Sequence, residues 1–354
     1  MSTLPEQVPN EPEDPLAGKA PAPQSTDPHA PENAPAPPAE WSGEPELPRP
    51  QEPETASPSV IAALPAAEIL SAPVFAVQTQ PPVLSEERIP HLAHLGVLSV
   101  LALFGLIGTF MLVPLALYFH LFGVTNVSQA STDYRYALGS QAAQYFITFV
   151  ESLVVFPLIW RKPFFEGIHW HGATARQRFG RLISIAVLCF FIAMINGVLM
   201  PGPTNAPIDQ LFQAPGAAWV LFIFGVTLAP FFEEMAFRGF LLPSLCTAYD
   251  WSVEHFTGAP RRPLDEFDNP QWSLPAMIVA SVLTSIPFAL MHGAQTSWSL
   301  GPFLLLIFVS LMLCWVRLST RSLAASTVVH ASYNFMLFSF MLLGTGGFKH
   351  LDKM

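Results

Sequence analysis

Seven long apolar runs constrain the fold of this chain more than any other feature of its sequence. Most of them approach or exceed the roughly 20 residues that an α-helix needs to cross a bilayer, and none alternates polar with apolar positions. The pattern therefore predicts helices, not the strands of a membrane barrel. The expected fold class is an all-α, polytopic transmembrane helical bundle. The runs are Leu95–Phe122, Ala142–Trp160, Leu182–Met200, Ala217–Leu245, Leu274–Met291, Pro302–Val316 and Leu323–Leu343.

The number of spans is left at about 7–8, because a proline within the fourth run and another within the fifth could divide those helices. Pro230 lies in the fourth run and Pro287 in the fifth. Proline removes a backbone donor and clashes with the preceding turn, so either helix can be kinked, split or re-entrant.

Composition separates an acidic tail from this membrane domain. The whole chain is 51% hydrophobic and only 12% charged, about half the charged share of a soluble domain. Residues 1–90 hold 21 of the 36 prolines and a net charge of −11, whereas residues 91–354 carry +1. We therefore expect a disordered Pro/Ala/Glu-rich tail over 1–90, open to a binding partner, and a transmembrane domain over 91–354. Nothing indicates a nucleic-acid partner.

Basic residues in the short loops predict the orientation. They gather between the second and third runs, between the fourth and fifth, and in the turn containing Arg317 and Arg321. The positive-inside rule then places these loops and the N-terminal tail in the cytoplasm. The expected localisation is multi-pass membrane, in a bacterial inner or plasma membrane. The stretch Ala248–Ser273 is polar, and we expect a long loop at the interface.

The stretch Phe231–Gly239 places three ionisable side chains inside the fourth apolar run. A charged residue at bilayer depth costs about 2.5–3.5 kcal/mol or more, so such groups usually serve a function. Glu234 and Arg238 are four residues apart and can pair on one helical face. Glu233 lies about 100° round the helix, which leaves its carboxylate for different work. The alternative is a structural ion pair that holds two helices together.

Two further polar pairs have helical spacing. His292 follows Phe288 by four residues at the end of the fifth run, and His330 precedes Asn334 by four in the seventh. Taken singly, His292 could be an interfacial residue and Asn334 an interhelical hydrogen-bond donor. Together with the carboxylates they have complementary chemistry: a carboxylate can activate water, and imidazole and carboxamide donors can stabilise an oxyanion. The combination indicates amide hydrolysis by activated water. The sequence contains no HExxH, GxSG or GxGD motif.

These three motifs, in this order on apolar helices, resemble the CPBP family. It comprises CAAX-prenyl-protease-2-like and bacteriocin-processing membrane proteins, also called Abi proteins, and the resemblance covers about residues 180–345. It implies an intramembrane protease of glutamic or metallo type. Carried over, Glu233 is the base that activates water and His292 assists it, while His330 and Asn334 hold the oxyanion. Glu234 and Arg238 support the site or contact substrate.

The resemblance leaves the metal and the substrate open. Such proteins are often called metalloproteases, and Glu233, His292 and His330 could hold a divalent ion such as zinc or could hold water directly. A lipidated C-terminus, a leader peptide or another membrane protein in the bilayer would each suit as substrate. Two other functions compete: a non-catalytic binding or immunity protein on the same scaffold, and a proton-coupled transporter that uses Glu151 and Glu233 as relays.

Overall fold

The computed structural model describes residues 88–202, 216–265 and 270–348, and this part of the chain is all-α. Seven helical segments within it are long and apolar enough to cross a membrane, which confirms the predicted class. Large apolar side chains such as Met111, Leu158 and Val198 remain exposed on the outside of the bundle. Their exposure is typical of a lipid-facing surface, because in water so much apolar area would drive association. The predicted tail, apart from residues 88–90, lies outside the described residues.

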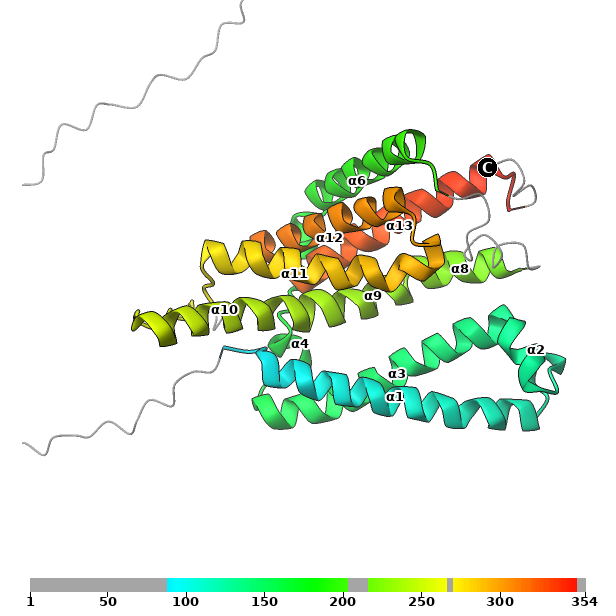
Figure 1. Ribbon diagram of the computed structural model, residues 1–354, viewed down its shortest axis with the longest axis horizontal. Coiled ribbons are helices and arrows are strands. Elements are labelled where there is room, and N and C mark those ends of the chain that lie inside the picture. The colour runs from blue at the N-terminus through cyan, green and yellow to red at the C-terminus, as the bar shows by residue number, and fades with distance from the viewer. Residues whose placement is uncertain (1–87, 203–215, 266–269, 349–354) are drawn as a thin grey trace, which may run out of the picture. The chain divides into compact units, whose positions relative to one another are not determined.

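The bundle is built from the following helices (Figure 1). Those that can span a membrane are α1 (Leu92–Tyr118), α3 (Tyr134–Trp160), α6 (Phe179–Leu199), a composite helix described below, α11 (Leu274–Gly293), α12 (Leu300–Thr320) and α13 (Leu323–Gly344). Short connecting helices are η2 (Leu121–Gly123), α2 (Val127–Thr132), α4 (Phe164–Gly167), α5 (Gly172–Gln177) and η4 (Ala294–Thr296).

The composite helix runs through the bundle between α1 and α3 on one side and α11 to α13 on the other (Figure 1). Its segments in order are α8 (Ala217–Val226), α9 (Leu228–Glu234), the π-helical η3 (Met235–Leu241) and α10 (Leu242–Thr257). The break between α8 and α9 falls at Thr227, where φ is −114° and ψ is −68°. Pro230 explains it, because its ring would clash with the carbonyl of Val226 four residues earlier. The proline therefore interrupts the helix without ending it.

The expected loop Ala248–Ser273 is wrong over its first ten residues. Helix α10 continues to Thr257 and ends at Gly258, whose φ of +69° gives a left-handed C-cap that glycine adopts without strain. Asp250 in this extension accepts hydrogen bonds from the backbone N–H and the hydroxyl of Ser273, at 2.8 and 2.5 Å. Ser273 is also the N-cap of α11. One carboxylate thus fixes the register between the antiparallel helices α10 and α11.

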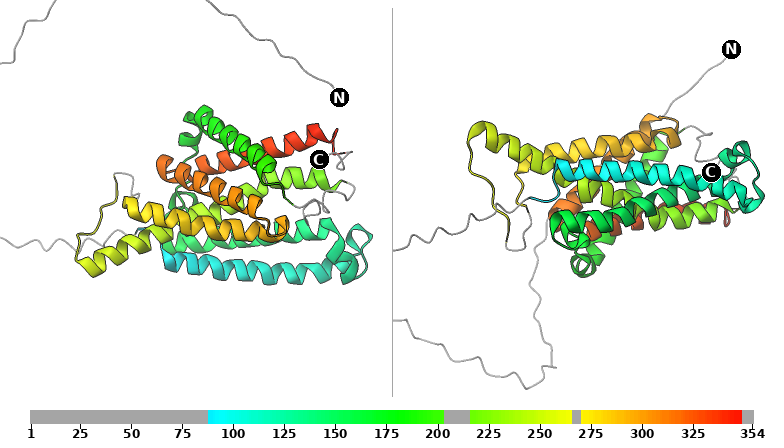
Figure 2. Two further views of the ribbon diagram at one scale, coloured as in Figure 1. Left: turned by 45° about the horizontal axis from the view of Figure 1, so that its top comes forward. Right: turned by 90° about the horizontal axis from the view of Figure 1, so that it is seen from below.

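Apolar clusters hold neighbouring helices against this composite helix, and another cluster joins α6, α12 and α13. Figure 2 shows the arrangement of the helices from two further sides. Aromatic rings from α3 and η3, including Phe156, Trp160 and Phe240, fill the contact on the α1–α3 side. Small residues such as Ala276 and Ala280 in α11 are fully buried, which lets backbones approach closely where lipid supplies no hydrophobic drive. The three cysteines are buried and free, as expected for small apolar packing residues.

Candidate active site

Four helical elements bring the predicted polar residues together. Glu233 and Glu234 end α9, Arg238 lies in η3, His292 lies near the end of α11, and His330 and Asn334 lie on α13. A π-helical turn widens the helix and is frequent at functional sites, and here it follows directly after the two glutamates. The close approach of residues from α9, α11 and α13 is the main structural prediction of the sequence, and the distances below describe it.

Glu234 and Arg238 form a fully buried ion pair. Arg238 Nη1 donates to Glu234 Oε1 at 3.0 Å, and both side chains have 0% exposure. The second terminal nitrogen of Arg238 donates to the backbone carbonyl and to the hydroxyl of Ser310 in α12, at 3.1 and 2.6 Å. The guanidinium carbon also lies 4.5 Å from the centre of the Phe288 ring. The i,i+4 pair predicted from the sequence is therefore present, within a larger network.

The network continues to His330. Its Nδ1 lies 3.0 Å from Glu234 Oε1, so the carboxylate accepts a hydrogen bond from the ring. His292 is held in the same manner, since its Nδ1 donates to the backbone carbonyl of Phe288 at 2.9 Å. In a neutral histidine whose Nδ1 carries the hydrogen, Nε2 is an acceptor. Both rings thus turn Nε2 away from their anchoring partners.

Glu233 faces both of these nitrogens. Its Oε2 lies 3.9 Å from His292 Nε2 and 3.9 Å from His330 Nε2. Glu233 is 9% exposed and His330 4% exposed. Phe288 lies beside both imidazoles, with ring centres 5.0 Å from His292 and 5.9 Å from His330. One carboxylate oxygen of α9 therefore lies near an imidazole nitrogen from each of two other helices, α11 and α13.

Asn334 lies farther along the same face of α13. Its Nδ2 donates to the backbone carbonyl of Gly225 in α8 at 2.8 Å, just before the break at Thr227. A carboxamide nitrogen carries two hydrogens, so one N–H remains beyond this bond. The contact fixes the side chain of Asn334 against the composite helix.

The register of α10 and α11 accounts for the meeting of Glu233 and His292. If the fourth helix ended near Leu245, as its apolar run predicts, the turn into the fifth helix would come earlier. His292, near the end of the fifth helix, would then lie closer to the opposite membrane face than Glu233 does. In the structure Glu233 lies 17 residues before Asp250, and His292 lies 19 residues after Ser273. At 1.5 Å per residue both separations are about 25–29 Å. The Asp250–Ser273 contact therefore brings the two side chains to the same level.

One buried charge and one buried hydroxyl that bind Arg238 could not be predicted from the sequence. Arg317, expected in a basic turn, is 2% exposed in the last turn of α12, and its Nε donates to the carbonyl of Arg238 at 3.2 Å. Ser310 binds Arg238 as described above. A short polar residue in an apolar run is a weak signal, and Arg317 lies near a helix end where basic residues usually reach water.

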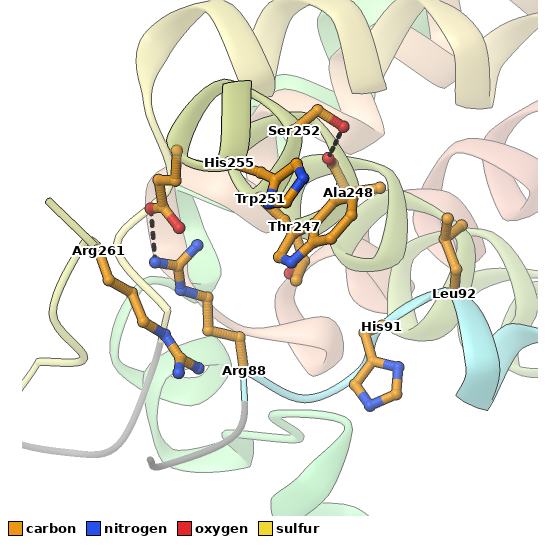
Figure 3. A pocket seen from close by; sticks show the side chains of 10 residues that line it. Arg88, His91, Leu92, Thr247, Ala248, Trp251, Ser252, His255 and Arg261 are labelled. Carbon is orange, nitrogen blue, oxygen red and sulfur yellow. Dashed lines mark hydrogen bonds and ion pairs between the residues drawn. The ribbon is translucent and has the colours of Figure 1, made fainter. Parts of the chain in front are cut away.

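A large cavity lies elsewhere in the described part of the molecule (Figure 3). It has a volume of about 680 Å³ and is lined by the residues that lead into α1, such as Arg88, and by α10, including Trp251 and His255. None of the six site residues lines it. Arg88 is already paired there with Glu254 at 2.6 Å. The chemistry-bearing groups lie instead in the close-packed interior.

Fold and site together define a class: a multi-pass helical membrane protein with carboxylates and imidazoles buried between its spans. Residues 215–336 match the family model described as "Type II CAAX prenyl endopeptidase Rce1-like". The matched segment contains all six predicted site residues, and this part of the chain is therefore similar to the CAAX-protease, or CPBP, family. No curated protein and no solved structure matches the chain. The match supports a protease in general terms.

Proposed function

We propose that this protein is an intramembrane endopeptidase that hydrolyses a peptide bond near the lipidated C-terminus of a membrane-anchored substrate. The observation that carries the proposal is the position of Glu233 Oε2, 3.9 Å from the Nε2 atoms of both His292 and His330. The description of the matching family, a prenyl endopeptidase, supports the lipidated substrate class. A site between apolar helices suits a substrate that lipid holds in the bilayer.

The geometry fits a water molecule between Glu233 and the imidazoles. With hydrogen bonds of about 2.7–2.8 Å, a water that bridges two atoms 3.9 Å apart has an angle near 90° at its oxygen. Glu233 takes a proton from this water, His292 orients it, and the hydroxide oxygen attacks the carbonyl carbon of the scissile bond. The C–N bond then breaks, the abstracted proton passes to the leaving amine, and the water oxygen stays in the new carboxyl group.

His330 and Asn334 supply the donors for the oxyanion. In the doubly protonated form of His330, Nδ1–H remains bonded to Glu234 and Nε2–H is free to donate. Asn334 contributes the N–H that the Gly225 carbonyl does not use. Glu234 and Arg238 act indirectly by fixing the ring of His330, and buried donors of this kind stabilise developing charge strongly because water is excluded.

A metal ion fits this arrangement less well than water. The donor chemistry is suitable, since each imidazole has its Nδ1 anchored as in many metal sites. Ligands of a tetrahedral zinc at about 2.0–2.1 Å would, however, lie about 3.3 Å apart, against the 3.9 Å found here. Within the described residues no three His, Cys, Asp or Glu side chains lie at metal-binding spacing. The proposed mechanism therefore uses water alone.

The test is cleavage by purified protein in proteoliposomes. A quenched fluorescent peptide ending in a prenylated CAAX sequence is compared with the same peptide lacking the lipid and with a leader peptide. We expect cleavage of the prenylated peptide, loss of cleavage in His330→Ala, and normal cleavage in Glu151→Gln, which changes a glutamate of α3 outside the site. A wild-type protein that cleaves none of the three would favour the binding or immunity function.

The orientation of the chain belongs to the same proposal. By the positive-inside rule, the basic loops on one side of the bundle support a cytoplasmic position for that side and for the N-terminal tail, and the membrane we propose is a bacterial inner or plasma membrane. A lipidated substrate would then reach the site from the cytoplasmic leaflet. Cysteine labelling at Arg178→Cys and at Val127→Cys, from either side of sealed vesicles, tests the orientation.

A further inference from the structure

Arg317 is a buried charge without a counter-charge. It is 2% exposed, and no carboxylate of the described residues lies within ion-pair distance of its guanidinium. Its Nε is bonded to the Arg238 carbonyl, but its Nη2 is buried and has no hydrogen-bond partner. Burying a charge without a partner is strongly unfavourable. A ligand that supplies negative charge would remove this penalty.

The guanidinium borders a cavity with a second unpartnered polar group. The cavity has a volume of about 340 Å³ and is lined by His169, Arg262, Trp272 and Ser319 as well as Arg317. His169 is 6% exposed, and its Nδ1 is buried without a hydrogen-bond partner. Water occupies about 30 Å³ per molecule, so the cavity has room for a polyatomic ligand. Two side chains that are more than nine-tenths buried thus present unsatisfied nitrogens at one cavity.

Among the residues that the structure describes, the lining of this cavity is also basic. Arg262 and Arg321 line the opening. Arg321 pairs with Asp265, and Arg262 lies 4.0 Å from Asp250, which Ser273 already uses for two hydrogen bonds. Within the described part of the chain, these two carboxylates balance the two rim arginines, and the positive charge of Arg317 remains. An anion with several acceptor oxygens therefore fits better than a neutral ligand.

We propose that this cavity is an anion site that binds a phosphate group. The phosphate can come from the headgroup of an anionic phospholipid or from phosphate free in solution. The cavity lies where α11 begins and α12 ends, which is the level at which lipid headgroups meet a spanning helix. Trp272 on its wall is of the type that gathers at this interface. The site is separate from the proposed protease chemistry and does not depend on it.

Occupancy of this site would also affect the composite helix. Arg317 holds the carbonyl of Arg238 within the π-helical segment. Neutralising Arg317 with a bound phosphate therefore stabilises the helix that carries the ion pair of Glu234 and Arg238. The expected sign is an increase in thermal stability on binding.

The experiment measures the thermal unfolding midpoint of the full chain in maltoside micelles that contain no phospholipid. One arm titrates inorganic phosphate against sodium chloride at matched ionic strength, and the other adds phosphatidylglycerol. We expect a saturable rise in the midpoint in at least one arm. A rise only with phosphatidylglycerol identifies a headgroup as the source, and a rise with inorganic phosphate shows that the free anion binds.

Three variants decide whether the cavity is responsible. Arg317→Gln and Arg262→Gln should weaken the apparent affinity about tenfold or more, as expected when a charged hydrogen-bond partner is lost. Arg178→Gln, at an exposed arginine outside the cavity, should leave it unchanged. If Arg317→Gln does not fold, Arg262→Gln alone carries the test. No saturable rise in either arm, or equal affinity in Arg262→Gln and Arg178→Gln, would overturn the proposal.

Discussion

The ion pair of Glu234 and Arg238 gives the sharpest prediction about stability. Arg238→Met replaces the guanidinium with an apolar side chain of similar length and leaves Glu234 buried at 0% exposure without its cation. Two unit charges about 4 Å apart interact by about 4 kcal/mol at an effective dielectric constant of 20. Measured losses for breaking one side of a buried pair are about 3–5 kcal/mol. We therefore expect a loss of about 3–5 kcal/mol in the free energy of unfolding.

A double variant separates the unpaired charge from lost packing. In Glu234→Gln/Arg238→Met the amide oxygen can still accept from His330, and no buried charge is left alone. We expect the double variant to recover at least half of the lost stability, while cleavage stays impaired because His330 is held differently. Unfolding in mixed micelles, followed by tryptophan fluorescence, measures both variants.

The matched control is the surface ion pair of Asp133 and Arg135. Arg135 is 38% exposed on its side chain, and exposed ion pairs contribute far less to stability than buried ones because water screens them. Arg135→Met should therefore change the free energy of unfolding much less than Arg238→Met does. The reasoning is refuted if Arg238→Met costs as little as Arg135→Met, or if the double variant is no more stable than Arg238→Met.

Three further predictions concern packing, pH and metal. A Cβ at Gly225 would lie 2.8 Å from the Phe338 ring, so Gly225→Ala should destabilise the fold by about 1–3 kcal/mol. Gly197→Ala should not, because no atom lies within 4 Å of a Cβ at that position. Thermal unfolding of the two variants compares their stability. Burial and the neighbouring Arg317, with His171 and Lys162, hold the pKa of His169 well below its usual range, although Asp265 opposes the shift. Stability should therefore be complete above about pH 6.5 and fall as the pH drops below that value, and His169→Gln should reduce this acid sensitivity in unfolding measured at pH 5 and 7.5. Removal of metal ions with a chelator should leave the cleavage rate within about twofold, because the proposed chemistry uses water alone; a rate restored only by added zinc would contradict this.

Most of the helical framework could be predicted from the sequence because lipid demands continuous apolar helices. The seven predicted runs correspond to the seven segments found. The extension of α10 to Thr257 could not be predicted in this manner, since it leaves the apolar run and carries Asp250 and Glu254. Its end is set by a glycine cap and its position by the contact with Ser273, which is a tertiary feature.

The candidate site could likewise be predicted from the sequence only in part. The pairing of Glu234 with Arg238 could be predicted because both lie on one helix, four residues apart. The partners of Arg238 and Asn334 could not, since Ser310 is 72 residues away and Gly225 is 109 residues away from the side chains they bind. The sequence predicts a turn position for Arg317, because basic residues at span ends usually reach water. Burial of that charge became visible only from the packing of α12 against η3.

The central claim is that Glu233 activates the attacking water, and a single-turnover rate measurement on Glu233→Gln tests it most directly. With the prenylated peptide bound in proteoliposomes, loss of a general base should lower the rate constant for cleavage by about 10²–10⁴-fold. The thermal midpoint should stay at the wild-type value, because Glu233 has no ion-pair partner closer than 3.9 Å. A folded Glu233→Gln variant that cleaves within about threefold of the wild-type rate would contradict the account.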